Sequence, residues 1–482
     1  MPYTVAIVGG GLVGSLSAVF CAKRGWKVDV YEAREDPRAQ HLEGGRSINL
    51  ALSVRGISAM TAAGVEKKIL DNMIPMRGRM IHSREGALQS QNYGSFGECI
   101  NSIDRNLMNE HLLSSADGFP NVKIHFNHKL DRCDFDGKKL TFMKAAADGS
   151  KPKEITVEAD LVIGADGAYS RVRNQLMRKE RVDFSQEYID NAYLELTIPP
   201  TSSGDFAMDA NHLHIWPRQT FMLIALPNTD KSFTVTLFMP WEMFAAVKTE
   251  ADVLELFEKH FADSVPLIGK EALLKDFFEH KPESLIQVKC RPYHYKDRAV
   301  ILGDAAHAMV PFYGQGMNCG MEDCLVLDEL ITEHLGRPSS PSSRSPSTTQ
   351  MSHVLAQYTL QRNRDVEAMC DLAMYNYVEM RDSVTKKEYL YRKKIEGWLH
   401  KLMPERIIPL YTMVSFSRIP YAEAMRRWQQ QTRWFNLGRK VVEVAGWGLI
   451  ASLAFYVGKR WRVTRGMLQA GVARAARNIN AP

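Results

Sequence analysis

The first 32 residues carry the pattern that most restricts how this chain folds. A short apolar run, Val5–Val8, leads into the glycine-rich segment 9–14 (GGGLVG), and a second apolar run, Lys27–Tyr31, ends at Glu32. This order predicts a strand, a G-x-G-x-x-G turn, a helix and a second, parallel strand. The glycines permit a tight turn and let bare backbone approach a diphosphate at the helix N-terminus. The segment therefore predicts a dinucleotide-binding α/β domain.

The acidic residue after the second run narrows the choice of nucleotide. A carboxylate at this place accepts hydrogen bonds from ribose hydroxyls and repels a 2′-phosphate. Glu32 therefore favours FAD or NAD over NADP as the nucleotide of this pocket.

Two further apolar runs end in glycine–aspartate turns. Residues 161–167 read LVIGADG, residues 299–307 read AVILGDAAH, and residues 314–318 read GQGMN. Each turn alone is equally compatible with ordinary loop chemistry. All three motifs, in this order and spacing, resemble those of the single-component flavoprotein aromatic hydroxylases. The resemblance implies bound FAD, NADPH as a transient reductant and O2 as co-substrate.

The resemblance also assigns cofactor contacts. In that family the aspartate of the third motif holds the ribityl chain, which places this role on Asp304, and the following helix start faces the flavin ring. The N-terminus of that helix supplies positive potential for a reduced, anionic flavin. The implied cofactor residues are Gly9, Gly11, Val13, Gly14, Tyr31, Glu32, Ala33, Arg34, Ala51, Arg105, Leu130, Asp166, Asp304, Met317 and Asn318. His307 lies within the same turn, and we expect it to be structural rather than a catalytic base.

The order of motifs predicts an interleaved, two-domain α/β architecture. A Rossmann-like FAD-binding domain spans residues 1–180 and resumes at 291–335, around a mixed-sheet substrate domain at 181–290. Within the latter, Tyr193–Ile198, His212–Trp216, Phe221–Leu226 and Phe233–Met239 are predicted strands. The Pro- and Ser-rich segment 336–352 is expected to be a disordered insertion. A helical region, 353–435, is expected to close the substrate site.

The C-terminal segment, 436–482, is predicted to anchor the chain in a membrane. Val441–Gly458 is an apolar run of 18 residues with basic residues on both sides, a length near the lower limit for a bilayer span. A buried C-terminal helix is the alternative. From Glu423 onward the chain has 11 Lys and Arg against two acids, a balance of +9 within a total of +6, so the preceding 422 residues carry −3. No nucleic-acid recognition motif accompanies this basic tail, and nucleic acid is not an expected partner.

The seven cysteines are scattered without a CxxC pair. This distribution is typical of reduced thiols in a cytosol-facing protein, and it offers no metal site.

Five other segments narrow the resemblance. They are 45–53 (GRSINLALS), 77–83 (RGRMIHS), 213–217 (LHIWP), 374–381 (MYNYVEMR) and 409–419 (PLYTMVSFSRI). Together they resemble the kynurenine 3-monooxygenase family over about residues 3–435. The resemblance implies hydroxylation of L-kynurenine to 3-hydroxykynurenine through a C4a-hydroperoxyflavin, in tryptophan degradation. It also implies the outer mitochondrial membrane, with the catalytic body facing the cytosol, although the tail would equally suit the endoplasmic reticulum.

The same resemblance implies a substrate site with an anion clamp at one end and apolar walls at the other. Arg79, Tyr93 and Tyr411 match carboxylate-binding residues, and Asn376 matches an amide at the amino-acid end. A guanidinium offers a bidentate fork for a carboxylate. The proposed ring walls are Phe221, Ile224, Phe238 and Phe312. No catalytic side chain is assigned, because the flavin carries the chemistry.

Two other functions remain open from the sequence. A related hydroxylase acting on another aromatic acid would need the anion clamp but no group for an α-ammonium. A non-catalytic flavoprotein-like scaffold, or a membrane-tethered protein whose flavin is structural, would not use NADPH.

Overall fold

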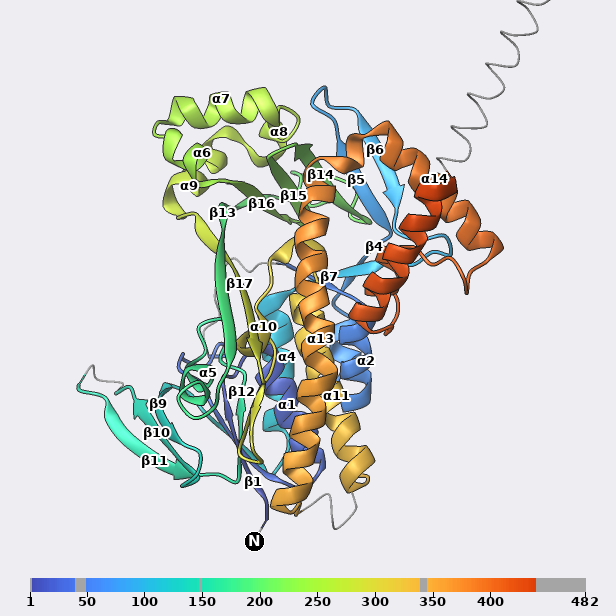
Figure 1. Ribbon diagram of the computed structural model, residues 1–482. Helices are drawn as coiled ribbons and strands as arrows, with labels where there is room; N and C mark the ends of the chain where they lie inside the picture. Colours follow the sequence, from blue (N-terminus) through green and yellow to red (C-terminus); the bar gives the residue numbers. More distant parts are fainter. Residues whose placement is uncertain (1, 40–48, 147–149, 339–344, 439–482) are drawn as a thin grey trace, which may run out of the picture. The chain divides into compact units, whose positions relative to one another are not determined.

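A computed structural model describes residues 2–39, 49–146, 150–338 and 345–438 (Figure 1). The chain divides into two compact units, Met1–Met425 and Arg426–Pro482. In the second unit, residues 426–438 are helical. The apolar run Val441–Gly458 lies outside the described residues, and within those residues no helix is both long enough and apolar enough to span a bilayer. All that follows concerns the first unit.

A six-stranded sheet forms the centre of the nucleotide-binding part. Its strands, in spatial order, are β18 (His294–Tyr295), β19 (Ala299–Ile301), β12 (Leu161–Gly164), β1 (Thr4–Val8), β2 (Lys27–Tyr31) and β8 (Val122–His125). All neighbours are parallel except β18 and β19. Near-continuous apolar runs suit such strands because helices and loops cover both faces. Since β19 pairs with β12, the chain re-enters this sheet after the substrate-domain strands.

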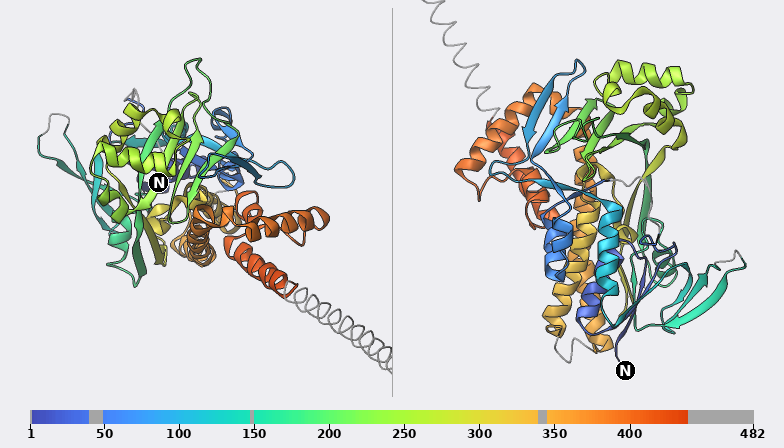
Figure 2. Two further views of the ribbon diagram at one scale, coloured as in Figure 1. Left: turned by 90° about the horizontal axis from the view of Figure 1, so that it is seen from above. Right: turned by 180° about the vertical axis from the view of Figure 1, so that it is seen from behind.

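Helices pack on this sheet and carry its turns. They are α1 (Leu12–Lys23), α2 (Val54–Ala63), α3 (Lys67–Leu70), α4 (Arg105–Asp117), α5 (Arg171–Leu176), α10 (Asp304–His307) and α11 (Gly316–Leu335). The view from behind in Figure 2 shows α2 in blue and α4 in cyan beside the gold α11. Helix α1 contacts both α4 and α11, so one apolar core joins the sheet to all three segments.

A seven-stranded mixed sheet forms the second large layer. Its order is β17 (Glu283–Arg291), β13 (Asp183–Ile198), β16 (Phe233–Pro240), β15 (Phe221–Pro227), β14 (His212–Arg218), β5 (Gly78–His82) and β6 (Leu88–Asn92). The four strands predicted between 193 and 239 are all present. Helices α6 (Trp241–Ala246), α7 (Glu250–His260), α8 (Val265–Ile268) and α9 (Lys270–Glu279) lie next to one face (Figure 1). The other face is left for the substrate site.

Two three-stranded sheets complete the β structure. One contains β3 (Asn49–Leu52), β7 (Ile100–Asp104) and β4 (Ile74–Met76), and the other contains β11 (Lys153–Glu158), β10 (Lys139–Lys144) and β9 (His128–Asp134). The first matters for function because β7 leads directly into α4 at Arg105.

The long helix α13 (Thr348–Arg381) connects the two large sheets. It contacts α11 and β18 along its length and β14 near its end (Figure 1). Ser347 and Gln350 form a reciprocal capping box at its start. Residues 348–352, expected to be disordered on composition, are therefore its first turn, because this cap outweighs the polar composition. The remaining elements are η1 (Pro311–Tyr313), η2 (Ser383–Thr385), α14 (Lys387–Leu402) and α15 (Leu410–Ser415).

Candidate active site

A cavity of about 790 Å³ lies between the carboxyl ends of the six-stranded sheet and the inner face of the seven-stranded sheet. Ligands of open α/β sheets bind at such strand ends. Every predicted cofactor residue lines this cavity except Gly14 and Asn318, and every predicted substrate residue lines it except Phe221. Residues separated by several hundred positions in the sequence are thus brought to one site.

The glycine turn after β1 meets the requirements of a diphosphate site. A Cβ atom added at Gly9, where φ is +105°, would lie 2.3 Å from the Ala165 carbonyl oxygen, and one at Gly14 would lie 1.9 Å from the Gly9 oxygen. At Gly11 an added Cβ would meet nothing within 4 Å. Gly9 and Gly14 are therefore needed for backbone packing, whereas Gly11 leaves the N-terminus of α1 open to the cavity. The turn fits the diphosphate of FAD.

Glu32 is held ionised at the end of β2. Its Oε2 accepts a hydrogen bond from the Gly10 N–H at 2.7 Å, and its Oε1 accepts two from Arg34 at 2.9 Å. Burial raises the pKa of this carboxyl, but these hydrogen bonds outweigh burial and hold the pKa below its usual range. An ionised carboxylate retains lone pairs for the ribose hydroxyls.

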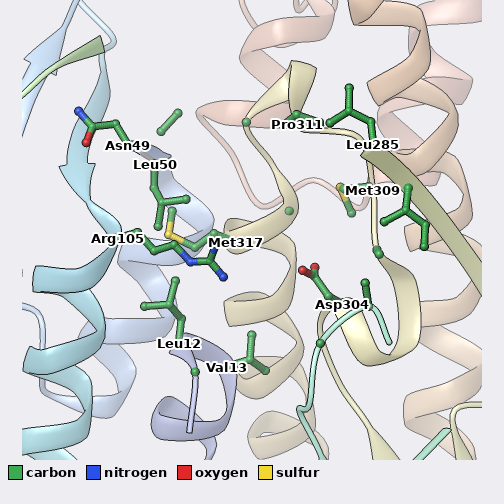
Figure 3. A pocket seen from close by; sticks show the side chains of 18 of the residues that line it. Leu12, Val13, Asn49, Leu50, Arg105, Leu285, Asp304, Met309, Pro311 and Met317 are labelled. Atoms are coloured by element: carbon green, nitrogen blue, oxygen red, sulfur yellow. The ribbon is translucent and has the colours of Figure 1, made fainter. Parts of the chain in front are cut away.

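Asp304 and Arg105 face the cavity from its opposite sides. In Figure 3 both side chains point inward, with Met317 beside Arg105 and Val13 below. Within the described chain, no group donates a hydrogen bond to the Asp304 carboxylate. Although its side chain is open to the cavity, the surrounding protein raises its pKa by desolvation, against the opposing effect of His307 and Arg105. An unpartnered carboxylate beside a glycine turn fits a polyhydroxyl chain such as the ribityl group.

A buried ionic cluster behind the cavity fixes this turn. Gly303 has a φ of +58°, and its N–H donates to Asp323 Oδ2 at 2.9 Å. The same carboxylate pairs with His307 Nε2 at 2.6 Å and with Arg362 Nε at 2.8 Å. The predicted structural role of His307 agrees with this geometry. Cys319 Sγ lies in the same group, but Arg362 also donates to it, so a guanidinium already balances the acid there.

Asn318 acts on the protein backbone rather than toward the cavity. Its Nδ2 donates to the carbonyl oxygens of Ala51 and Gly314, both at 2.8 Å, and its Oδ1 accepts from Ser53 N–H at 2.8 Å. The expectation of a direct side-chain contact with the flavin is therefore replaced by a structural one. Asn318 ties β3 to the start of α11, and so aligns two walls of the cofactor site.

Asp166 also serves the backbone although it lines the cavity. Its carboxylate accepts from Ser170 Oγ at 2.5 Å and from the N–H groups of Arg171 and Val172 at 2.6 and 3.1 Å. These bonds shape the turn between β12 and α5, and the turn then presents its backbone to the cavity.

Arg79, on β5, supplies positive charge at the far end of the cavity. The buried guanidinium pairs with Glu379 Oε1 at 3.0 Å and contacts Asn376 Oδ1 at 3.5 Å, while its Nε has no partner. Burial raises the pKa of Glu379, but Lys393 and Arg79 outweigh this and lower it, so Glu379 is ionised. Two cations around one carboxylate leave this end positive.

Three stacked phenols stand beside this charge. The Tyr93 and Tyr411 rings are 4.9 Å apart and nearly parallel, and Tyr313 stacks on Tyr411 at 5.5 Å. The Arg79 guanidinium lies 5.0 Å from the Tyr411 ring centre. The Tyr93 hydroxyl is buried without a hydrogen-bond partner. Unpaired donors on Tyr93 and Arg79 next to a positive centre fit an incoming carboxylate.

The ring-wall prediction fails at Phe221. Alternate residues of β15 point to opposite faces of the sheet. Phe221 packs against Phe261 at 5.8 Å and belongs to the core under α7–α9, whereas Met222 and Ile224 face the cavity. Phe221 and Ile224 are three positions apart, so they cannot share a face. Phe238 and Phe312 do line the cavity, with rings 5.0 Å apart.

Comparison with known proteins decides the family. A family model described as "FAD binding domain" matches residues 2–343. Kynurenine 3-monooxygenase of Sus scrofa is 50% identical over 90% of this chain and 88% of its own length. The protein of that name from Anopheles gambiae is 48% identical over 89% of this chain and 86% of its own length.

The chain belongs to the kynurenine 3-monooxygenase family. The predicted α/β FAD-binding fold with mixed sheets and a helical C-terminal region is thereby confirmed, and so is FAD as cofactor. A solved structure of 2-methyl-3-hydroxypyridine-5-carboxylic acid oxygenase matches with a TM-score of 0.61 at 17% identity, over 80% of this chain and 95% of that one. That likeness extends to the fold alone.

Several residues of the site were missed in the sequence. Glu379, which pairs with Arg79, lies within a segment quoted for the family resemblance, but nothing in its spacing indicates a partner on β5. Tyr389 of α14, which donates to Glu379 Oε1 at 2.7 Å, has no such signal. Met222 could have been found, because it shares the period of two with Ile224.

Proposed function

We propose that this protein is an FAD-dependent monooxygenase that hydroxylates L-kynurenine at ring position 3, with NADPH as reductant and O2 as the source of the oxygen atom. Close similarity to kynurenine 3-monooxygenases over most of the chain supports this function. The observation that carries it in the site is the single cavity with two unlike ends. One end fits a dinucleotide, and the other presents positive charge beside apolar walls.

The residues of the cofactor end would hold FAD at its diphosphate, ribose and ribityl groups. The open backbone at Gly11 suits the diphosphate, Glu32 suits the ribose, and Asp304 suits the ribityl chain. When bound, FAD takes a hydride from NADPH and supplies the oxygen-activating chemistry. The N-terminus of α11 contributes positive potential next to it.

The residues of the other end would position the amino acid. Arg79 and the phenols Tyr93 and Tyr411 take the carboxylate, and Asn376 stands beside the amino-acid end. Ile224 lies on the wall for the aromatic ring, with Phe238 and Phe312 nearby, and this wall excludes water. The aniline nitrogen of kynurenine already activates the adjacent ring carbon, so positioning rather than a strong protein base is required.

The test is NADPH oxidation by the full chain with and without L-kynurenine, with the product analysed by mass spectrometry. We expect many-fold stimulation by kynurenine and a product heavier by one oxygen atom. Peroxide without a hydroxylated product would refute kynurenine as the substrate and point to another aromatic acid. A flavin that NADPH never reduces would refute the enzymatic function altogether. Arg79→Ala should raise the KM for kynurenine while FAD stays bound.

We also propose that residues 436–482 attach the protein to the outer mitochondrial membrane, with the catalytic unit facing the cytosol. The apolar run Val441–Gly458 and the basic residues around it support attachment. Fractionation of cells that express the full chain tests the address, and protease treatment of intact mitochondria tests the orientation. Recovery with the endoplasmic reticulum, or protection of the catalytic unit from protease, would refute the respective part.

A further inference from the structure

Helix α14 (Lys387–Leu402) presents an apolar face to solvent. Tyr391, Ile395, Trp398 and Leu402 recur at intervals of four, three and four residues, so they share one side of the helix. Their exposed fractions are 69%, 49%, 62% and 60%. We call these four residues the apolar stripe. Surface helices of soluble proteins bury such a face, and a contiguous exposed one marks an interaction surface.

The opposite side of α14 is polar and faces the protein. The Tyr389 hydroxyl donates to Glu379 Oε1 at 2.7 Å, and His400 Nδ1 contacts the Ile407 carbonyl oxygen at 2.7 Å. Burial lowers the pKa of Lys393, while the Glu379 carboxylate opposes that shift. The helix is therefore inverted, with ionic and hydrogen-bonding groups inside and large apolar groups outside. Packing of the folded unit does not explain the stripe.

Basic residues run along one edge of the stripe. Lys387, Lys394 and Lys401 recur every seven residues, which keeps them within about 40° of each other around the helix. All three are exposed, and the exposed acid of this helix is Glu388 in its first turn. Tyrosine and tryptophan within the stripe are the residues enriched at membrane–water interfaces. Apolar residues edged by lysines match the chemistry of a bilayer that contains anionic lipids.

We propose that the apolar stripe and its lysine edge bind the headgroup region of an anionic membrane, with α14 lying in the plane of the interface. This inference rests on the membrane attachment proposed above. The apolar run at Val441 begins 16 residues after the first unit ends at Met425, so the bilayer is within reach of that unit. A second copy of the chain is a poorer occupant, because a two-fold contact through this face would bring the lysine rows together.

The experiment uses the full chain in vesicles of phosphatidylcholine, with and without phosphatidylserine. Ile395→Cys carries an environment-sensitive fluorophore such as NBD on the stripe. Leu360→Cys on α13 is the matched control, since Leu360 is also a helical apolar residue and is 62% exposed. Six of the seven native cysteines are buried, and the unsubstituted chain labelled in parallel gives the background. Flotation with the vesicles reports attachment of the chain independently of the fluorophore.

We expect the label at position 395, but not at 360, to shift its emission to shorter wavelength and to be quenched by nitroxide-bearing lipids. The shift should be larger with phosphatidylserine and should shrink when Lys387, Lys394 and Lys401 are changed to Glu. A chain that floats while both labels stay in water overturns the stripe proposal and leaves the attachment intact. A chain that does not float overturns both. A shift without lipid that grows with protein concentration identifies another copy as the occupant and overturns the membrane.

Discussion

The unpaired hydroxyl of Tyr93 makes a prediction that separates binding from stability. This hydroxyl is buried and has no hydrogen-bond partner in the substrate-free protein. It adjoins Tyr411 and Arg79, where the carboxylate of kynurenine is proposed to bind. Tyr93→Phe keeps the ring stack and removes only the hydroxyl. The substitution should therefore weaken substrate binding without weakening the fold.

The magnitudes follow from the two states of the hydroxyl. A buried polar group without a partner costs at least about 1 kcal/mol, so its removal should raise the melting temperature by roughly 2 °C for a chain of this size. A hydrogen bond to a charged acceptor contributes about 1.5–3 kcal/mol. Its loss should raise the KM for kynurenine roughly 10- to 150-fold.

Tyr358 provides the matched control. Its hydroxyl is also buried without a partner, but Tyr358 does not line the cavity. Tyr358→Phe should raise the melting temperature similarly and leave the KM unchanged. The assays are thermal unfolding of the FAD-loaded protein and steady-state oxidation of NADPH against kynurenine concentration. A lower melting temperature for Tyr93→Phe with an unchanged KM would show that the hydroxyl is structural and would refute the reasoning.

Three other substitutions or pairs test the geometry. Gly11→Ala should fold normally but lose FAD affinity, since its Cβ would enter open space, whereas Gly14→Ala should lower the yield of folded protein; flavin content and unfolding measurements check both. Ile224→Ala should raise the KM for kynurenine, whereas Phe221→Leu should cost about 1 kcal/mol of stability and leave the KM unchanged, as kinetics and denaturant unfolding would reveal. Burial lowers the pKa of His214 from 6.5 to about 4, so below pH 6.5 the unfolded chain binds a proton that the folded protein does not. The free energy of unfolding should fall by about 3 kcal/mol between these pH values, and His214→Asn should flatten that fall in pH-dependent unfolding measurements.

The parts of the site that the sequence predicted are those with local signals. The glycine turn, Glu32 and Asp304 each follow a short apolar run, and their chemistry depends on neighbours within a few residues. The four strands between 193 and 239 were likewise visible as apolar runs. Residues of these kinds line the cavity because a parallel sheet brings its strand ends together.

The parts that it did not predict depend on contacts across the fold. Glu379 pairs with Arg79 across 300 residues of sequence, and no spacing rule links α13 to β5. Asn318 and Gly14 were grouped with cofactor contacts, although their atoms support the backbone behind the cavity. Phe221 is different, because the alternation of side chains along β15 already excluded it from the wall that includes Ile224.

The strand order of the six-stranded sheet sets a limit on how early this enzyme can acquire its cofactor during synthesis. Strand β1 is made first, yet one neighbour, β12, ends at Gly164, and the next strand, β19, ends at Ile301. Asp304 and the start of α11 emerge later still. At about 5–20 residues per second, the ribosome needs roughly 15–60 s to reach them. The nascent N-terminal segment must therefore wait, with its apolar strands unpaired, until well over half of the chain has been made.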